Sequence, residues 1–177
     1  MSQWGSEPVS IDASAAGAAA DGTGHEMLSW QIWTDGASSP DGRGGWAYVV
    51  VDDNNTKIRC AQGSALGVTH QRMELRAVAE ALVDFPRDVP VEVIGDSAYA
   101  IDGFNAEDEE WHVRWERNGW RNSSGKQVAN RDEWERILVA LRARLAGTTW
   151  RRVPGHRKGE YPWNDLADTL AVAAKNA

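Results

Sequence analysis

The sequence QIWTDGASSPDGRGGWAYVV, from Gln31 to Val50, decides the fold, because it holds two apolar segments joined by a glycine-rich turn. The pattern predicts a strand over Leu28 to Thr34, a turn from Gly36 to Gly45, and a second, antiparallel strand from Trp46 to Val51. Asp35 stands where the first strand ends. Asp-Gly is also ordinary turn chemistry, so this carboxylate alone does not distinguish a functional residue from a turn residue.

The composition indicates one folded domain. A length of 177 residues, an apolar content of 42% and ten tryptophans are enough for a substantial core. Cys60 is the only cysteine, which excludes a disulfide within the chain, and the sequence shows neither a secretory signal nor an apolar run of membrane-spanning length. A cytoplasmic protein is expected. Residues 1–26, rich in Ala, Gly, Ser and Asp, are predicted to be a disordered leader before a domain over residues 27–177.

The charge is unevenly distributed along the chain. A net charge of -7 argues against a nucleic-acid partner, because phosphates are contacted by Lys and Arg. Twelve of the 19 Lys and Arg nevertheless lie between Trp111 and Lys158, where only four residues are acidic. Within this segment, cations alternate with tryptophans: Trp111, Arg114, Trp115, Arg117, Trp120, Arg121 and Lys126. The pattern fits a surface for a polynucleotide backbone, or a solvated face with tryptophans packed beneath it.

The remaining chain alternates strands and helices. Further strands are predicted at Lys57–Ser64, Pro90–Gly95 and Thr148–Val153. Helices are predicted at Arg72–Phe85 with Thr69 as N-cap, Ala98–Phe104, Asp108–Arg117, Asp132–Ala146 and Trp163–Ala174. The core stripe of the helix over 132–146 is expected to be Trp134, Ile137, Leu138, Leu141 and Leu145. This order predicts an α/β fold with a mixed five-stranded sheet, three antiparallel strands followed by two parallel ones, and helices on both faces.

Acidic residues recur at informative places in these elements. Glu74 lies in line with the apolar stripe of its helix, and Asp96 follows the strand Pro90–Gly95 at a strand-to-helix junction, where open α/β sheets bind ligands. If that strand neighbours the first one, Asp35 and Asp96 are neighbours as well. Glu74 also suits the helix dipole, and Asp96 also suits a helix cap, so each residue has a structural alternative. Asp168 flanks the apolar stripe of the last helix.

Five short blocks, in order, resemble type 1 ribonuclease H of the cellular and bacterial kind. They are TDGAS from Thr34, THQRMEL from Thr69, GDSAY from Gly95, VPGH from Val153 and NDLADTLA from Asn164. The similarity extends from about Trp30 to the C-terminus. It implies a ribonuclease H-like fold, a catalytic domain over residues 27–177, and a monomeric enzyme that hydrolyses the RNA strand of RNA:DNA hybrids to leave 5′-phosphate and 3′-hydroxyl ends.

The resemblance also implies roles for individual residues. Asp35, Glu74, Asp96 and Asp168 match the carboxylates that bind two Mg²⁺ ions, for which Mn²⁺ is a substitute, and the register of NDLADTLA favours Asp168 over Asp165. His156 matches a mobile-loop histidine that moves protons or releases product. Contacts with the hybrid are implied for the block Thr69, His70 and Gln71, and for a basic protrusion over about 111–131 that contains Trp111, Arg114, Trp115, Arg117, Trp120, Arg121 and Lys126.

Two positions depart from the family pattern. His70 stands where the family commonly has an Asn that contacts the hybrid, and the glycine-rich turn offers Ser38 and Ser39 where an Asn is often found. Both changes concern recognition of the minor groove and the 2′-hydroxyl groups, which are the groups that distinguish RNA from DNA.

The chemistry of phosphodiester hydrolysis suits clustered carboxylates. Two divalent cations can activate water and stabilise the leaving oxygen, and magnesium prefers oxygen ligands. Three alternatives remain: a binding module without activity, a DNA nuclease of the same fold, and a glycosidase with paired carboxylates. The binding module would not need four acids, the DNA nuclease does not account for THQRMEL and the protrusion, and the glycosidase does not explain the basic segment.

Overall fold

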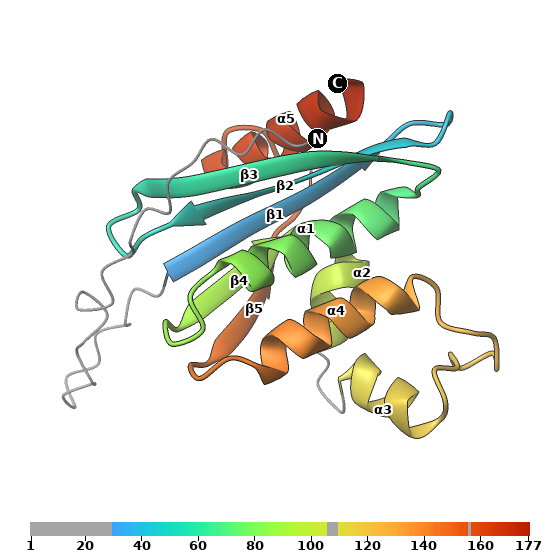
Figure 1. Cartoon of the computed structure of the whole chain (residues 1–177). Helices are drawn as coiled ribbons and strands as arrows, with labels where there is room; N and C mark the ends of the chain where they lie inside the picture. Colours follow the sequence, from blue (N-terminus) through green and yellow to red (C-terminus); the bar gives the residue numbers. More distant parts are fainter. Residues whose placement is uncertain (1–29, 106–109, 156) are drawn as a thin grey trace.

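The computed structural model describes residues 30–105, 110–155 and 157–177. It contains one five-stranded sheet in the order β3-β2-β1-β4-β5 (Figure 1). The strands are β1 (Trp30–Ser38), β2 (Arg43–Val51), β3 (Lys57–Leu66), β4 (Val91–Gly95) and β5 (Thr148–Arg152). β1, β2 and β3 pair antiparallel, and β4 pairs parallel with both β1 and β5. The predicted mixed sheet is therefore confirmed, whereas the predicted leader and His156 lie outside the described residues.

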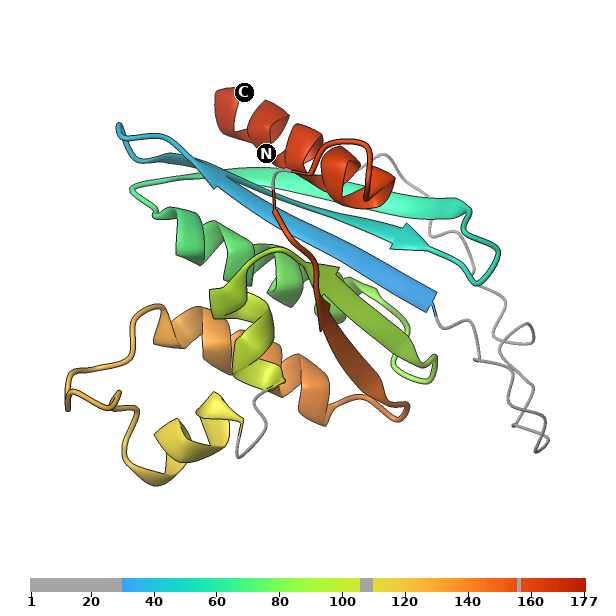
Figure 2. The same cartoon turned by 180° about the vertical axis from the view of Figure 1, so that it is seen from behind.

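Helices cover both faces of this sheet. Helix α1 (His70–Asp84) and helix α4 (Arg131–Arg142) lie on one face, and helix α5 (Pro162–Asn176) crosses the other, as Figures 1 and 2 show. Short helical segments follow β4: α2 (Ala98–Ile101), η2 (Asp102–Phe104) and α3 (Trp111–Arg117). Apolar side chains of α1 and α4 form the larger core, and a second core lies under α5. Among the described residues, no helix is long and apolar enough to cross a membrane.

The hairpin of β1 and β2 is longer than predicted. Its strands pair as far as Ser38 and Gly44, so Gly36, Gly44 and Gly45, which were expected in the turn, belong to the strands. The reason is close packing of helices. A Cβ atom at Gly36 would lie 2.3 Å from the backbone nitrogen of Glu74 in α1, and one at Gly45 would lie 2.1 Å from the carbonyl oxygen of Ala171 in α5. The glycines therefore allow one helix on each face to touch the hairpin.

The predicted end of the helix over 132–146 is wrong. Helix α4 stops at Arg142, and Leu145, which was expected in the core, is 86% exposed. The backbone N–H groups of Leu145 and Ala146 donate to the carbonyl oxygen of Arg87, and the Arg144 guanidinium donates to the carbonyl oxygens of Pro86 and Val89. These bonds tie the chain to the loop before β4, and they replace the last helical turn.

A buried carboxylate joins α1 to α4. Glu133 is 0% exposed, and three guanidinium groups surround it. The nearest atoms of Arg72 and Arg136 lie 3.3 and 3.2 Å away, and Arg76 donates to the same carboxylate from its Nε at 2.8 Å. A buried charge is tolerated only when it is paired and hydrogen-bonded, so this cluster holds the two helices in one arrangement.

Glu133→Gln should destabilise the protein by about 3 kcal/mol, because breaking a buried ion pair leaves charges without compensation. Urea unfolding would measure the change. Glu135→Gln is the matched control: Glu135 pairs with Arg131 at 2.8 Å on the surface, and its loss should cost less than about 1 kcal/mol. Equal midpoints for the two variants would show that the Glu133 cluster does not stabilise the packing of α1 on α4.

Candidate active site

The parallel pairing of β1 and β4 brings Asp35 and Asp96 together. The last paired residues are Trp33 and Ile94, and Asp35 in β1 and Asp96 directly after β4 each lie two residues further along the chain. The strands diverge here, because β1 continues beside β2 while the chain after β4 turns into α2. The sequence predicted that the two carboxylates would be neighbours if these two strands paired. The structure contains this pairing.

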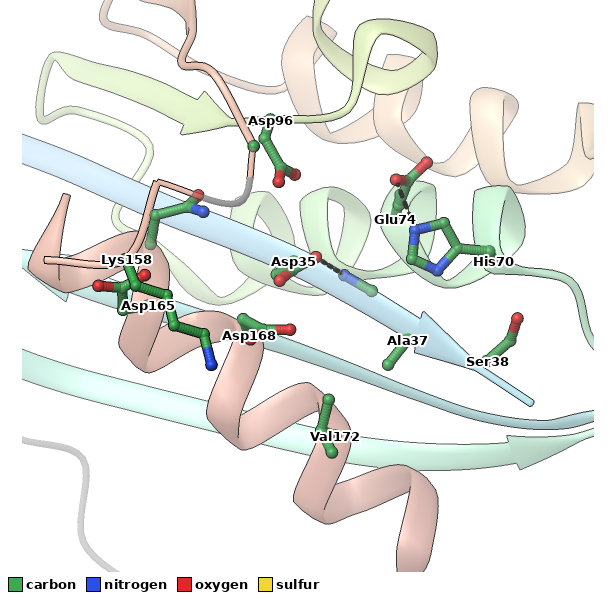
Figure 3. A pocket seen from close by; sticks show the side chains of 13 residues that line it. Asp35, Ala37, Ser38, His70, Glu74, Asp96, Lys158, Asp165, Asp168 and Val172 are labelled. Carbon is green, nitrogen blue, oxygen red and sulfur yellow. Dashed lines mark hydrogen bonds and ion pairs between the residues drawn. The ribbon is translucent and has the colours of Figure 1, made fainter. Parts of the chain in front are cut away.

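Helices α1 and α5 supply the other two carboxylates. Glu74 comes from the first turns of α1, and Asp168 comes from α5 on the opposite face of the sheet (Figure 3). All four acids line one cleft of about 530 Å³. The remaining lining residues are Gly36, Ala37, Ser38, His70, Gly155, Lys158, Asn164, Asp165 and Val172. Four elements distant in sequence therefore converge on the cleft.

Asp35 is the most buried of the four acids, at 8% exposure. Burial, together with the negative charges of Asp96 and Asp168, raises the pKa of Asp35 to about 8, although a 2.7 Å hydrogen bond from the Gly36 N–H opposes the rise. Without a cation, this carboxyl group therefore binds a proton near neutral pH. Like-charge crowding of this kind is what a divalent cation relieves.

Glu74 is oriented by two neighbours. The Ser97 hydroxyl donates to Glu74 Oε2 at 2.6 Å, and His70 Nε2 lies 3.1 Å from Glu74 Oε1. His70 is one helical turn before Glu74 on α1, and the Glu74 carboxylate, together with Asp35 and Asp96, raises the pKa of His70. Ser97 also caps α2 by accepting from the Ala100 N–H. The sequence pointed to the GDSAY block, but it gave no reason to single out Ser97.

Ser97→Ala should lower kcat about tenfold with little change in KM, because loss of a group that orients a metal-binding carboxylate typically costs tenfold to a hundredfold. Steady-state kinetics on a hybrid substrate would test this. Ser97→Thr keeps the hydroxyl and should recover most of the activity, which separates loss of the Glu74 contact from general damage to α2. A Ser97→Ala enzyme with unchanged kcat would rule out this role.

The donor chemistry of the cleft suits magnesium, since the four carboxylates offer oxygen atoms. In the described part of the chain, no three His, Cys, Asp or Glu side chains converge closely enough to hold one metal ion. The contacts of Glu74 with Ser97 and His70 explain part of this separation, because they keep its carboxylate on the α1 side of the cleft. The residues fit such a site by the oxygen atoms that they offer and by their place in one cleft.

Asp165, the alternative to Asp168, makes a structural contact with the backbone. Its Oδ2 accepts the backbone N–H of Gly159 at 2.6 Å, which ties the loop after β5 to the start of α5. Asp168 instead faces Asp35, and its negative charge raises the pKa of the Asp35 carboxyl group. Lys158 and Asn164 also line the cleft, although sequence reasoning assigned them no role. Nearby, a Cβ at Gly155 would lie 2.7 Å from Asp96 Oδ2, so this loop packs directly on the carboxylate.

The basic protrusion is only partly as expected. Trp115 and Trp120 are 9% and 6% exposed and pack in the core with Trp134, so they do not offer flat faces to a ligand. This corrects their assignment as nucleic-acid contacts and favours the packing alternative for both. Trp111 is half-buried beside a groove of about 220 Å³. The cations Arg114, Arg117, Arg121 and Lys126 are exposed, as are Thr69, His70 and Gln71 at the start of α1.

The sheet order and the helices on both faces define a ribonuclease H-like fold, with an acidic cleft where β1 and β4 diverge. Residues 28–176 match the RNase H family model. A ribonuclease H of Acidiphilium cryptum is 38% identical over 83% of this chain and 86% of its own, and one of Parvibaculum lavamentivorans is 36% identical over 80% and 88%. The chain therefore belongs to the ribonuclease H family of enzymes.

Solved structures agree on the fold. RNase H1 from the halophilic archaeon Halobacterium salinarum aligns with a TM-score of 0.58 at 20% identity, over 83% of this chain and 97% of that one. A foamy viral protease-reverse transcriptase in complex with RNA/DNA hybrid aligns with a TM-score of 0.67 at 22% identity, over 84% of this chain and 20% of that longer chain. At these identities the likeness concerns the fold.

Proposed function

We propose that this enzyme hydrolyses the RNA strand of RNA:DNA hybrids with two divalent metal ions, magnesium or manganese, and leaves 5′-phosphate and 3′-hydroxyl ends. One observation carries the proposal: Asp35, Glu74, Asp96 and Asp168 line the same cleft although they come from four segments that are far apart in the sequence. The family membership and the hybrid bound to the foamy viral neighbour support the choice of substrate. We retain the monomeric state and the cytoplasmic location as predictions.

The four acids would hold the cations, which when bound supply activation of the attacking water and stabilisation of the leaving 3′ oxygen. Asp35, at the centre of the cleft in Figure 3, lies between Glu74 of α1 and Asp168 of α5, and it would hold the metal together with these carboxylates. Ser97 holds Glu74 in place, and Gly155 leaves room for Asp96. His156, outside the described residues, is proposed to move protons or release product.

Substrate binding is proposed to extend from the cleft to the N-terminal end of α1 and to the protrusion that precedes α4. Thr69, His70 and Gln71 are exposed at the N-terminal end of α1, where His70 lines the cleft, and they are assigned to the hybrid near the cut. The exposed cations of the protrusion, Arg114, Arg117, Arg121 and Lys126, are assigned to the phosphates of the DNA strand. Trp111 is retained as a contact because it borders a groove beside Arg114.

The purified protein should be incubated with magnesium and end-labelled RNA:DNA hybrid, single-stranded RNA and duplex DNA, with and without EDTA. Cleavage of the hybrid's RNA strand alone, lost with EDTA, is the expected result, and end analysis should give 5′-phosphates. Cleavage of duplex DNA would instead indicate a DNA nuclease of the same fold. Absence of cleavage with either magnesium or manganese would favour a binding module.

A further inference from the structure

His70 places an imidazole next to a carboxylate of the cleft. It lies on α1 one turn before Glu74, and its Nε2 is 3.1 Å from Glu74 Oε1 (Figure 3). The Ser97 hydroxyl occupies the other carboxylate oxygen at 2.6 Å, so Oε1 is the oxygen left facing the imidazole. The His70 side chain is more than half exposed, and it belongs to the lining of the cleft. The function proposed above assigns His70 to the hybrid and gives its Nε2 atom no part in metal binding.

The distance between His70 Nε2 and Glu74 Oε1 is one at which a single metal ion can bind both atoms. Nitrogen and oxygen ligands lie about 2.1 Å from small divalent cations, so two ligands at a right angle are about 3.0 Å apart. The observed 3.1 Å between His70 Nε2 and Glu74 Oε1 is close to that value. A cation could therefore bind both atoms without a change of either residue's place on the helix.

The two ligand types discriminate between metals. Magnesium prefers oxygen ligands, whereas an imidazole nitrogen favours transition-metal ions. We propose that His70 is a direct metal ligand beside Glu74, and that it shifts the preference of this cleft from Mg²⁺ towards transition-metal ions such as Mn²⁺. The inference rests on the proposed function, because it takes Glu74 as a metal ligand, but it concerns which ion is bound.

The test uses Mn²⁺ as the probe, on the full chain without substrate. Electron paramagnetic resonance of free Mn²⁺ gives its affinity, and competition with Mg²⁺ gives the ratio of the two affinities. His70→Asn should lower the preference for Mn²⁺ over Mg²⁺ at least about tenfold, at the lower end of the effects seen when groups around a metal are lost. Pulsed measurements should show a nitrogen-14 coupling to bound Mn²⁺ in the parent protein and none in His70→Asn.

Two further variants make the outcomes distinct. Asp35→Asn should weaken both metals and leave their affinity ratio unchanged, because Asp35 offers only oxygen. His156→Asn should keep the nitrogen coupling, which assigns that coupling to His70. A parent protein without the coupling, or a His70→Asn protein that retains the coupling and the affinity ratio, would overturn the inference. Failure of the proposed function would appear separately, as hybrid cleavage that survives Asp35→Asn.

Discussion

Asp35→Asn should abolish hybrid cleavage, with kcat lowered about a thousandfold or more, while the fold is kept. The loss of a central metal-binding carboxylate removes several kcal/mol of transition-state stabilisation, and each 1.4 kcal/mol corresponds to about a factor of ten in rate. Single-turnover cleavage of the hybrid would measure it. Asp41→Asn is the matched control, because Asp41 lies exposed in the turn of the same hairpin and should not affect activity. An Asp35→Asn enzyme with normal, metal-dependent activity would contradict the assignment.

The same variant should change how stability depends on pH when metal is removed with EDTA. The pKa of Asp35 is raised from 3.8 to about 8 in the folded protein, so the folded state holds this proton more tightly than the unfolded chain. The resulting stabilisation is complete below about pH 4 and is lost as the pH rises through 8. Thermal unfolding of the parent protein should show this decline, and Asp35→Asn should show less of it.

Gly36→Ala should destabilise the protein by about 3 kcal/mol or more and should also reduce cleavage. The added Cβ would lie 2.3 Å from the Glu74 backbone nitrogen and 2.5 Å from the Met73 carbonyl carbon, and these atoms cannot move without moving α1. Displacement of α1 carries Glu74 away from Asp35, so stability and activity fall together. Urea unfolding and hybrid cleavage are the two measurements.

Gly147→Ala is the control for this substitution. Nothing lies within 4 Å of a Cβ at Gly147, so the change should be close to neutral or slightly stabilising. If Gly36→Ala were as stable and as active as Gly147→Ala, the close contact between β1 and α1 would not determine the position of Glu74. A folded but inactive Gly36→Ala protein would still agree with displacement of the carboxylate.

Much of the fold could be predicted because its signals are local. The strand order, the capped helix after Thr69 and the strand ending at Asp96 follow from periodicity and turn chemistry, and the structure contains them. The predicted turn over Gly36 to Gly45 was too long because glycine occurs both in turns and in strands that pack closely against a helix. In sequence it signals a turn, but at Gly36 and Gly45 it lets a helix approach the sheet, and that approach involves residues far away in the chain.

Burial decided the roles that a local pattern leaves open. Trp115 and Trp120 alternate with cations in sequence, yet both are buried: the Trp115 ring packs against Trp134 from α4, and the Trp120 ring packs against Trp115. Glu133 resembles a first-turn acid of α4, but Arg72 and Arg76 from α1 make it a buried ion-pair centre. Neither outcome follows from spacing, because each depends on how two helices pack.

The sequence by itself determined which residues are candidates for the chemistry. Asp35, Glu74, Asp96 and Asp168 were predicted from short blocks that resemble ribonuclease H, because strand ends and apolar stripes alone left a structural alternative for the first three. The tertiary structure alone decided how those groups are held. Parallel pairing of β1 with β4 places Asp35 and Asp96 at the same edge of the sheet. Ser97 and His70 orient the Glu74 carboxylate. The pairing of β1 with β4 and the contact between Ser97 and Glu74 join residues that are far apart in the sequence, so only folding brings them together, whereas the contact between His70 and Glu74 lies within α1.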